Sequence, residues 1–547
     1  MTSNIWTNNI ELNLRLVDQN LGPSVFVAVT GNEKDRNYWQ DHFESVRGEL
    51  FRRDESTLIL SVAETTKKGN FLGTLNAWIE TRKNQDVSAR NLPDITLLNM
   101  LFGQGKRFSP FTQALGNRKS AFLLPFNSQK SGLFFSTADL SCLYTNLWID
   151  QLRQQGFRGV VAKWGDEAVI PGRIMDSSKQ GFAKSDGVRF IWKTSLTEEL
   201  ARDKEWILVE SSTKLVKKQF ARSNYQNLYE KLSSLPEHLY EVGVNLGSLA
   251  ISYDFLDIAI NVFEEDIADK SKWIDWDPYV WIALHTESLD KWYEVVEEEK
   301  MLGLSGLQDL VQRYPDLYEK ISEVRRRLEE KNDRSFSIHS FDFGKPYWAD
   351  FGLHHSLRSQ LESLLAKSDD GVVSRKLFQI PEETDENGNR IIRSSIPDNA
   401  KITNSIIMDS VITDSNTEID NGLVVGGLHG SILMPYGGSA LFCSVDHLEF
   451  SGPHGVAFGS VGKSVALEQG GRHTTLFTYP KFKHLVGSEK VIDLKGENYE
   501  NKILGNDLSF AEAETLMSEV DPQGIEKLRQ QIRTHGWKHL EELSNET

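Results

Sequence analysis

The sequence is poor in three features that would each define a class of protein: cysteine, long apolar runs and basic charge. It has two cysteines in 547 residues, Cys142 and Cys443. Two cysteines so far apart exclude a disulfide scaffold and a cysteine-based zinc site, and they fit a reducing, cytoplasmic location. No apolar run approaches the roughly 18 residues that a membrane helix needs. The N-terminal segment lacks the basic and apolar regions of a signal peptide, so we expect neither a membrane partner nor a leader.

Basic charge is scarce relative to acidic charge. The chain holds 61 Lys and Arg against 78 Asp and Glu, a formal net charge of −17. Such a chain lacks the electrostatic footprint that long nucleic acid requires, so nucleic acid is not an expected partner. An anionic substrate would need local help from backbone dipoles, a few Lys or Arg side chains and a divalent metal.

Short apolar runs alternate with helical stretches in the first third of the chain. The expected strands are residues 24–29, 58–62, 94–102 and 159–163. Helices are expected between them, over residues 34–50 and 75–82. Strands separated by helices favour βαβ units, and therefore an α/β fold with a mostly parallel, Rossmann-like sheet.

The segment from residue 285 to 333 is rich in helix formers and acidic residues, and we expect it to be a solvated helical insertion. Just before it, three tryptophans cluster in an aromatic segment: Trp273, Trp276 and Trp281. Core packing is the preferred interpretation of this cluster, with stacking on a sugar as the alternative.

From about residue 396 the pattern changes. Apolar pairs such as Ile406-Ile407 and Val411-Ile412 recur at five-residue spacing between small polar residues. A short fixed period of this kind is typical of a stacked parallel β-helix, with a β-sandwich of coincidental spacing as the alternative. The last residues are expected to return to helix, with Ser509 and Glu512 forming a capping box.

A glycine-containing loop follows the third expected strand. It carries Gly103, Gly105, Arg107, Pro110 and Thr112, in the pattern G-x-G-x-R-x-x-P-x-T. Glycines after a buried strand let the backbone approach a phosphate, whose oxygens then accept hydrogen bonds from successive N–H groups. The loop lacks both the GK[ST] of a Walker loop and the third glycine of a dinucleotide-binding fingerprint. A plain glycine turn is the alternative.

The pattern resembles the signature loop of the sugar-1-phosphate nucleotidyltransferases, the NDP-sugar pyrophosphorylases. That family has Thr or Ser in the place of Lys106, and a lysine that contacts phosphate follows its loop. Lys119 occupies that place here after a two-residue insertion, with Arg118 as the alternative. The resemblance implies that nucleotide phosphates are bound by Gly103, Gln104, Gly105 and Lys106. It implies catalytic roles for Arg107 and Lys119.

Two later segments resemble the metal-binding motifs of the same family. Asp166 ends the segment GVVAKWGD, which looks like the strand that presents a Mg²⁺-binding carboxylate. Asp350 stands in the segment YWADFG, which is similar to the element that supplies the second metal carboxylate. The resemblance therefore implies a Mg²⁺ cofactor. The alternatives are that Asp166 is a turn residue and that Asp350 caps a helix over residues 354–366.

Two further segments match the sugar-binding strands of the family. The segment FIWKT takes the place of a Glu-Lys-Pro strand, which assigns Lys193 to the sugar phosphate, although the family's Glu is absent here. The segment VNLGSL looks like a strand beside the sugar, which assigns Asn245 and Gly247 to sugar-phosphate binding. A plain surface lysine is the alternative for Lys193.

One departure from the family concerns the order of the chain. Family members begin with the glycine loop, but about 95 residues precede the loop and its strand here. Within them, the segment VAVTG looks like the family's second strand. The segment GNFLGTLNA looks like the helix start that faces the base, which assigns Gly73 and Thr74 to nucleotide binding. We therefore hypothesise that residues 20–95 are permuted strands of the same sheet. Glu64 stands where the family often has a base-reading Gln, so the base stays open.

The resemblance implies transfer of a nucleotidyl group from an NTP to a sugar 1-phosphate, giving an NDP-sugar and pyrophosphate. A non-catalytic homologue that binds nucleotide or sugar phosphate and regulates a partner is the alternative. The open end of the β-helix would offer a surface for homo-oligomer formation. The expected organisation is a catalytic domain over 1–353, a linker over 354–395, a short left-handed β-helix over 396–460 and a β/helical tail over 461–547.

Overall fold

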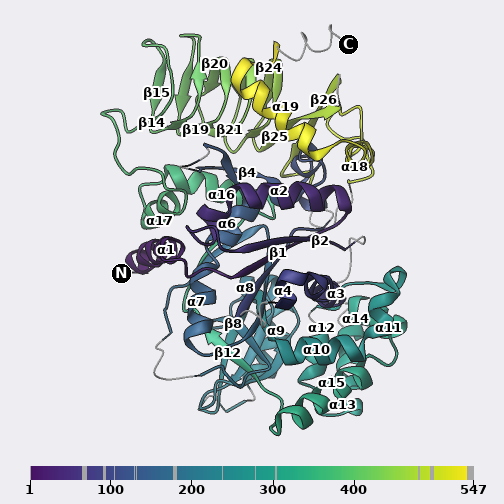
Figure 1. Cartoon of the computed structure of the whole chain (residues 1–547). Coiled ribbons are helices and arrows are strands. Elements are labelled where there is room, and N and C mark those ends of the chain that lie inside the picture. The colour runs from purple at the N-terminus through teal and green to yellow at the C-terminus, as the bar shows by residue number, and fades with distance from the viewer. Residues whose placement is uncertain are drawn as a thin grey trace.

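The protein has three parts, which Figure 1 shows one above another: a helical part, a central α/β part and a part built of short strands. The computed structural model describes residues 2–64, 70–89, 94–103, 105–128, 130, 132–175, 181–233, 235–236, 238–277, 279–301, 305–478, 481–492 and 498–538. The first helix, α1 (Thr2–Asp18), lies beside the central part, and the last, α19 (Pro522–His535), runs along the strand part.

A mixed sheet, of nine strands within the described residues, forms the centre. Four parallel strands are neighbours in the order β2, β1, β3, β6. Beyond β6 the sheet continues with β11, which is antiparallel to its neighbours β6, β8 and β9. The strands are β1 (Val25–Thr30), β2 (Leu58–Ala63), β3 (Ile95–Met100), β6 (Gly159–Trp164), β8 (Gly187–Lys193), β9 (Trp206–Glu210), β10 (Val216–Phe220), β11 (Tyr240–Ser252) and β12 (Ile338–Asp342).

The expectation of a mostly parallel sheet holds only for β2, β1, β3 and β6, because the pairings made by β11 and β9 are antiparallel. Helices cover both faces of the parallel strands, as buried parallel strands require. Every residue of β1 is buried, and its side chains alternate between two cores. Phe26 and Ala28 belong to one core, whereas Val25, Val27 and Val29 belong to the other. The first core is covered by α2 (Glu33–Leu50), α6 (Thr137–Leu143) and α7 (Asn146–Gln154), and the second by α3 (Asn70–Lys83) and α10 (Tyr253–Val262).

The segment before the glycine loop lies in the same sheet as the loop's own strand. Val25 of β1 pairs with Leu58 of β2 on one side and with Thr96 of β3 on the other. The carboxyl ends of all four parallel strands therefore meet at one edge.

Smaller elements of this part are α4 (Gln85–Ala89), α5 (Phe111–Ala114), β4 (Leu123–Asn127), β5 (Phe134–Ser136), β7 (Glu167–Ile170), α8 (Glu198–Asp203), α9 (Tyr225–Ser233) and β13 (Tyr347–Asp350).

The segment expected to be a helical insertion is helical, and its helices begin earlier than expected, with α10. The three tryptophans before it are buried, with 3% (Trp273), 0% (Trp276) and 4% (Trp281) of their surface exposed. They pack in the core on the α3 face of the sheet, as the preferred interpretation had it. The remaining helices are α11 (Glu264–Ala268), α12 (Tyr279–Leu284), α13 (Leu289–Met301), α14 (Ser305–Arg313) and α15 (Leu317–Asn332).

The expectation of a linker over 354–395 is wrong for most of that range. Two helices occupy it, α16 (His354–Leu365) and α17 (Asp369–Leu377). Leu357, Leu361 and Leu364 are fully buried in the core of the first sheet face. Their helical spacing gives α16 an apolar side that must be covered, which a solvated linker would not have.

From residue 390 onward short strands form two parallel sheets, and with one exception consecutive strands alternate between them. In the first sheet Ile406 pairs with Leu423, and Leu423 pairs with Ser439, so each strand returns after 17 or 16 residues. The first sheet holds β14 (Arg390–Ile392), β16 (Ile406–Met408), β19 (Gly422–Val425), β21 (Gly438–Leu441), β23 (Val456–Phe458) and β25 (Gly471–Thr478). The second holds β15 (Lys401–Thr403), β17 (Val411–Ile412), β18 (Glu418–Asp420), β20 (Leu428–Met434), β22 (Ser444–Phe450) and β24 (Val461–Leu467).

The parallel strands extend beyond the expected range of 396–460 at both ends. β14 precedes that range, and β24 and β25 follow it in parallel register with β22 and β23. The later turns lack the regular apolar pairs of the earlier ones, so sequence spacing alone did not reveal them. Apolar side chains from successive turns form a common interior between the two sheets, including Ile407, Val424, Ala440 and Ala457.

The tail contains one further strand and two helices. β26 (Lys481–Ser488) pairs with β25 in antiparallel register and closes the first of the two parallel sheets. α18 (Phe510–Ser518) begins with the capping box expected at Ser509 and Glu512, whose side chains each accept the other's backbone N–H. Among the described residues, no helix is both long and apolar enough to cross a membrane.

We expect Ile407→Ala to lower the free energy of unfolding by about 2–5 kcal/mol, because it leaves a cavity between the two parallel sheets. Ile407 is fully buried there. The measurement is urea denaturation followed by circular dichroism. Val411→Ala is the matched control on the next strand, where the side chain is 42% exposed and little should change. If both variants lose the same free energy of unfolding, the burial of Ile407 between the two sheets is contradicted.

Candidate functional site

A two-stranded ladder brings two aspartates from distant segments together. β7 directly follows Asp166, and β13 ends at Asp350. The two strands are antiparallel, with Asp350 opposite Glu167, and the N–H of Phe351 donates to the carbonyl oxygen of Asp166 at 2.9 Å. The ladder therefore sets Asp166 and Asp350 side by side at the edge where β6 ends.

The surroundings of Gly352 show how closely the charged groups converge. A Cβ atom on Gly352 would lie 2.8 Å from Asp166 Oδ2, 2.8 Å from Lys119 Nζ and 3.0 Å from Asp350 Oδ1. The two carboxylate oxygens are therefore less than about 6 Å apart, with the ammonium beside them. No side chain fits at position 352 without displacing a charged group, so this close approach requires glycine.

Lys119 and Asp166 form an ion pair at the centre of this group. Lys119 begins the short helix η2 (Lys119–Ala121), and its Nζ donates to Asp166 Oδ2. Burial acts to raise the pKa of Asp166, but the charges of Lys119 and Lys163 and the hydrogen bond from Lys119 bring it below the ordinary value. Asp166 is therefore ionised at neutral pH. Both side chains keep a solvent-facing side, with 20% and 24% exposed.

A second ion pair joins Lys163 to Glu167, the residue that follows Asp166. The Nζ of Lys163 donates to Glu167 Oε1 at 2.8 Å, and Trp348 Nε1 donates to Glu167 Oε2 at 2.8 Å. Burial raises the pKa of Glu167, and the neighbouring carboxylates of Asp166 and Asp350 raise it further, against the opposing effect of Lys163. The carboxylates of Asp166 and Asp350 thus disfavour the charged form of Glu167, and the ammonium group of Lys163 offsets this.

Asp350 does not cap the following helix. Its Oδ1 accepts a hydrogen bond from the N–H of Gly352 at 2.7 Å. The residue at the N-cap of α16 is Leu353, and no side chain caps that helix. The helix-cap alternative is therefore wrong, and the carboxylate of Asp350 belongs to the group around Asp166.

The glycine loop lies against the turn that carries Lys119. Gly105 adopts the left-handed φ of +58°, and its carbonyl accepts a hydrogen bond from Thr112 Oγ1 at 2.9 Å. A Cβ atom on Gly105 would lie 3.2 Å from Lys119 Cβ. Gly103 has a φ of +133° and open space around it. Gln104 lies outside the described residues. The loop and the ion pair are thus parts of one site.

The basic residues of the loop point in different directions. Lys106 Nζ lies over the ring of Tyr499, 4.7 Å from its centroid. Arg107 is exposed on the short helix η1 (Lys106–Phe108). Arg118 is buried against Tyr38 on α2, 4.3 Å from the ring centroid, so it faces away from Asp166. Of Arg118 and Lys119, the structure therefore brings Lys119 to the aspartates.

The tail of the chain holds the segment that follows the loop. Gln113 Nε2 donates to the hydroxyl of Tyr499 at 3.2 Å, and that hydroxyl donates to Glu514 at 2.6 Å. Asn117 Nδ2 donates to the carbonyl oxygen of Glu514 at 2.7 Å, and Arg529 donates to a carbonyl of α5. We call Tyr499, Glu514 and Arg529 the C-terminal clasp.

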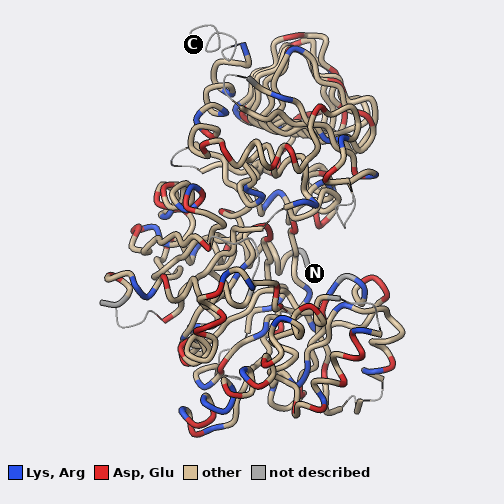
Figure 2. The backbone as a smooth tube through the Cα atoms, turned by 90° about the vertical axis from the view of Figure 1, so that its right-hand side faces the viewer, with Lys and Arg blue, Asp and Glu red and all other residues tan. Residues whose placement is uncertain are grey.

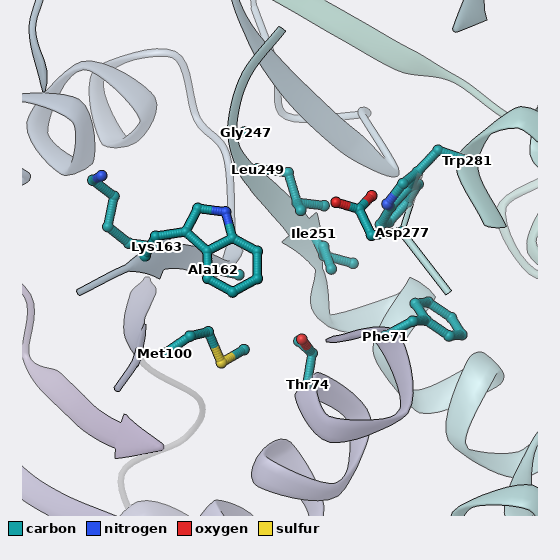
Figure 3. A pocket seen from close by; sticks show the side chains of 11 residues that line it. Phe71, Thr74, Met100, Ala162, Lys163, Gly247, Leu249, Ile251, Asp277 and Trp281 are labelled. Carbon is teal, nitrogen blue, oxygen red and sulfur yellow. The ribbon is translucent and has the colours of Figure 1, made fainter. Parts of the chain in front are cut away.

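A pocket opens beside this site, between α3 and the central strands (Figure 3). It measures about 440 Å³, counting space open to solvent. Thr74, expected at the nucleotide, and Gly247, expected at the sugar, both line it. Its other lining residues are Phe71, Met100, Ala162, Lys163, Trp164, Leu249, Ile251, Asp277 and Trp281.

Three other expected site residues contact neighbouring carboxylates. Gly73 packs against Glu64, and a Cβ atom there would clash with its carboxylate. Asn245 Nδ2 donates to Glu205 Oε2 at 3.0 Å. Lys193 is half-exposed and pairs with Glu241 at 2.8 Å. Lys193 and Asn245 therefore have structural partners, which the sequence did not indicate.

Sequence reasoning missed Lys163, Glu167, Gly352 and Asp277. The first two flank the Gly165-Asp166 turn, and their four-residue spacing with opposite charges was the available signal. Gly352 ends the motif that identified Asp350. Asp277 carried no signal, because it lies in an irregular segment between aromatic residues.

The donor set suits one hard cation shared with a ligand. Among the described residues, no group of three or more His, Cys, Asp or Glu side chains is arranged to hold a metal ion. Two carboxylates fit Mg²⁺, which commonly takes one or two protein carboxylates and completes its shell with water and phosphate oxygens. Figure 2 shows acidic and basic residues interspersed along the chain, so an anion must be attracted by local groups such as Lys119.

A double-mutant cycle on Lys119→Met and Asp166→Asn should give a coupling free energy of about 1–3 kcal/mol, between the values of exposed and buried pairs. The measurement is the free energy of unfolding of the four proteins. Lys291→Met with Glu294→Gln is the matched control, an exposed pair whose coupling should be clearly smaller because solvent screens it. If the two substitutions change the free energy of unfolding additively, the ion pair between Lys119 and Asp166 is contradicted.

Tyr499→Ala should loosen the segment 106–117, because the ring contact with Lys106 and the hydrogen bond from Gln113 are both lost. We expect amide hydrogen exchange there to accelerate about tenfold or more, while the central sheet keeps its protection. Tyr436→Ala, at a tyrosine that is 63% exposed, is the matched control. Unchanged exchange over 106–117 would show that the clasp does not hold the loop.

No protein-family model matches the chain, and no curated protein matches it in sequence. The function is therefore inferred from the side-chain geometry of the site.

Proposed function

We propose that the protein is a Mg²⁺-dependent nucleotidyltransferase that forms an NDP-sugar and pyrophosphate from an NTP and a sugar 1-phosphate. The observation that carries the proposal is the convergence of Lys119, Asp166 and Asp350 on one point beside Gly352, next to the glycine loop. A loop of backbone donors, a lysine and two carboxylates are the groups that bind and align phosphates with a cation.

The arrangement of the chain around this site also supports the proposal. The glycine loop follows β3 and Asp166 follows β6, and these strands are neighbours. β1 and β2 precede β3 in sequence but extend the sheet on its far side. We interpret this as a nucleotidyltransferase sheet whose first strands are permuted. We likewise interpret the two alternating parallel sheets as the coils of the β-helix that the resemblance implies.

The reaction requires alignment more than covalent chemistry by the protein. An oxygen of the sugar phosphate attacks the α-phosphorus of the NTP, the bond to the bridging oxygen of the β-phosphate breaks, and pyrophosphate leaves. Backbone N–H groups of the loop would hold the β- and γ-phosphates, with Arg107 free to reach them from its exposed position. Lys119 would neutralise charge that develops at the α-phosphate.

Asp166 and Asp350 are the residues that would hold Mg²⁺. The bound cation would neutralise charge on the transferring phosphoryl group and on the departing pyrophosphate. Against the effect of burial, Lys119 lowers the pKa of Asp166, so this carboxylate is ionised, as a Mg²⁺ ligand must be. Glu167 and Lys163 keep Asp166 in place from the opposite side of the turn.

Two observations favour a second candidate, a homologue that binds nucleotide or sugar phosphate without catalysis. Lys119 is engaged by Asp166, and Lys106 is turned toward Tyr499, away from the space over the loop. A ligand could then bind through the loop backbone while the carboxylates stay neutralised by protein groups. Such a protein would respond to ligand without releasing pyrophosphate.

The experiment is pyrophosphate release with Mg²⁺ across four NTPs and a dozen sugar 1-phosphates. We expect turnover with one pair, and a loss of about a hundredfold or more in Asp166→Asn and in Asp350→Asn, because each variant removes a cation ligand. Asp290→Asn, at an exposed position on α13, is the matched control and should keep wild-type turnover.

The same panel of substrates distinguishes the transferase from the non-catalytic candidate. Silence of the wild type with every pair, together with ligand-dependent shifts in its melting temperature, would favour the non-catalytic candidate. Full activity in Asp166→Asn would contradict the assigned role of the site even if turnover were found.

A further inference from the structure

Another pocket lies where α19 meets the strand part of the molecule. Figure 1 shows this helix running along the short strands, and the pocket lies between the helix, the ends of these strands and β4. It measures about 280 Å³, counting space open to solvent. We call it the α19 pocket. Its apolar lining consists of Leu123, Phe442, Phe458, Val461, Phe477 and Ile532.

Two arginines provide the charged lining of the α19 pocket, Arg529 and Arg533. They are four residues apart, so they project from the same face of the helix. Arg529 is 6% exposed, and the side chain of Arg533 is 15% exposed. The Nε of Arg529 and the Nη1 of Arg533 are both buried, and neither has an acceptor among the described residues. A buried donor without an acceptor costs free energy, which an acceptor on a ligand would restore.

The other contacts of these guanidinium groups hold them in place with neutral partners. Arg529 Nη2 donates to the carbonyl oxygen of Ala114 on α5, in the segment that the C-terminal clasp holds. The guanidinium of Arg529 lies 5.6 Å from the ring centroid of Phe458, and that of Arg533 lies 5.7 Å from the centroid of Phe442. Aromatic faces attract a cation without neutralising it, so the charge of both groups is available to an anion.

Carboxylates near the two arginines balance the positive charge only in part. Glu526 lies 3.6 Å from Arg533, and Asp35 lies 3.6 Å from the neighbouring Arg118, both longer than a normal hydrogen bond. Burial lowers the pKa of Arg529 to about 10; Glu526 opposes this effect, and the charges of Arg118 and Arg533 add to it. Arg529 therefore stays charged at neutral pH. Three guanidinium groups beside two carboxylates leave an excess of positive charge, which favours an anion.

The unpaired donors and the apolar walls together indicate the kind of anion. A carboxylate has two oxygens in one plane, and guanidinium N–H groups bind such oxygens through short, directed hydrogen bonds. A phosphate group carries more oxygens than the pocket has unpaired donors, and apolar walls would leave the others without partners at a cost in free energy. The same walls suit a ligand body made of C–H groups.

We propose that the α19 pocket binds a small monocarboxylate with an apolar body. Its two oxygens accept hydrogen bonds from Arg529 Nε and Arg533 Nη1, and its body packs against the apolar lining. This site is separate from the one proposed for the NTP and the sugar 1-phosphate, since no lining residue belongs to the glycine loop or to the group around Asp166. Because the same guanidinium of Arg529 donates to Ala114, a bound carboxylate also restrains α5.

The test is calorimetric titration of the full chain with butyrate, isovalerate and benzoate, each beside its neutral amide. We expect a carboxylate to bind with one molecule per chain, and its amide to bind about tenfold more weakly or less, because hydrogen bonds between two charged groups are the stronger ones. Equal affinity for an acid and its amide would overturn the proposal, and so would the absence of binding by all three carboxylates. Inorganic phosphate is the competing anion, and its binding in place of the carboxylates would overturn the ligand class.

A variant of α19 tests where the carboxylate binds. Arg533→Met removes one unpaired donor and leaves the contact between Arg529 and Ala114, and it should raise the dissociation constant about tenfold or more. Lys527→Met, at an exposed position of the same helix, removes the same charge and should leave the affinity unchanged. Thermal melting confirms that each variant is folded. Unchanged affinity in Arg533→Met would overturn the site, as would a loss in Lys119→Met, which would place the carboxylate at the glycine loop.

Amide hydrogen exchange locates the ligand without any substitution. A bound carboxylate should slow exchange severalfold in α19 and over residues 111–117, and should leave α3 unchanged. Slowing in other segments alone would overturn the location. Neither measurement depends on pyrophosphate release, so a failure of the transferase proposal leaves this one standing, and a failure here leaves the transferase proposal standing.

Discussion

The parallel pairing of β1, β3 and β6 is the constraint on which the rest of this structure depends. Parallel neighbours end at the same edge of a sheet, so the segments that follow them meet there whatever their separation in sequence. The glycine loop after β3 and Asp166 after β6 are brought together in this way. Because these strands are buried on both faces, their register cannot shift without moving apolar side chains out of two cores at once.

Contacts between distant segments then complete the site. Trp348 and Glu167 are 181 positions apart in sequence, and their hydrogen bond ties β13 to the turn after β6. Asp350 thereby joins Asp166, and the lack of a side chain at Gly352 leaves room for both beside Lys119. The site thus holds three carboxylates and two lysine ammonium groups close together, on a backbone that keeps the carboxylates from separating, and a bound cation would stabilise this arrangement.

The sequence predicted the parts of this site that carry local patterns, and it missed those that depend on tertiary contact. Apolar runs indicated β1, β2, β3 and β6, and short motifs singled out Asp166, Asp350 and Lys119. The helices within the expected linker over 354–395 were not predicted, although their leucines have helical spacing. This segment lies between the expected catalytic domain and the expected β-helix, and it was interpreted as the connection between them. Asp277 could not be predicted, since it lines a pocket that five separate segments form. The partners of Lys193 and Asn245 are likewise cross-strand neighbours.

The C-terminal clasp has a consequence for the order in which the molecule matures. The segment between Gly105 and Lys119 is held by Tyr499, Glu514 and Arg529, which are synthesised almost 400 residues later. While the ribosome is still translating the short strands, the central sheet and the core on its α3 face can already form, because their residues extend only to Asp342. The glycine loop cannot be fastened until the residues of the clasp have been synthesised. A nascent chain therefore passes through a stage in which the sheet has formed and the glycine loop is not yet fastened.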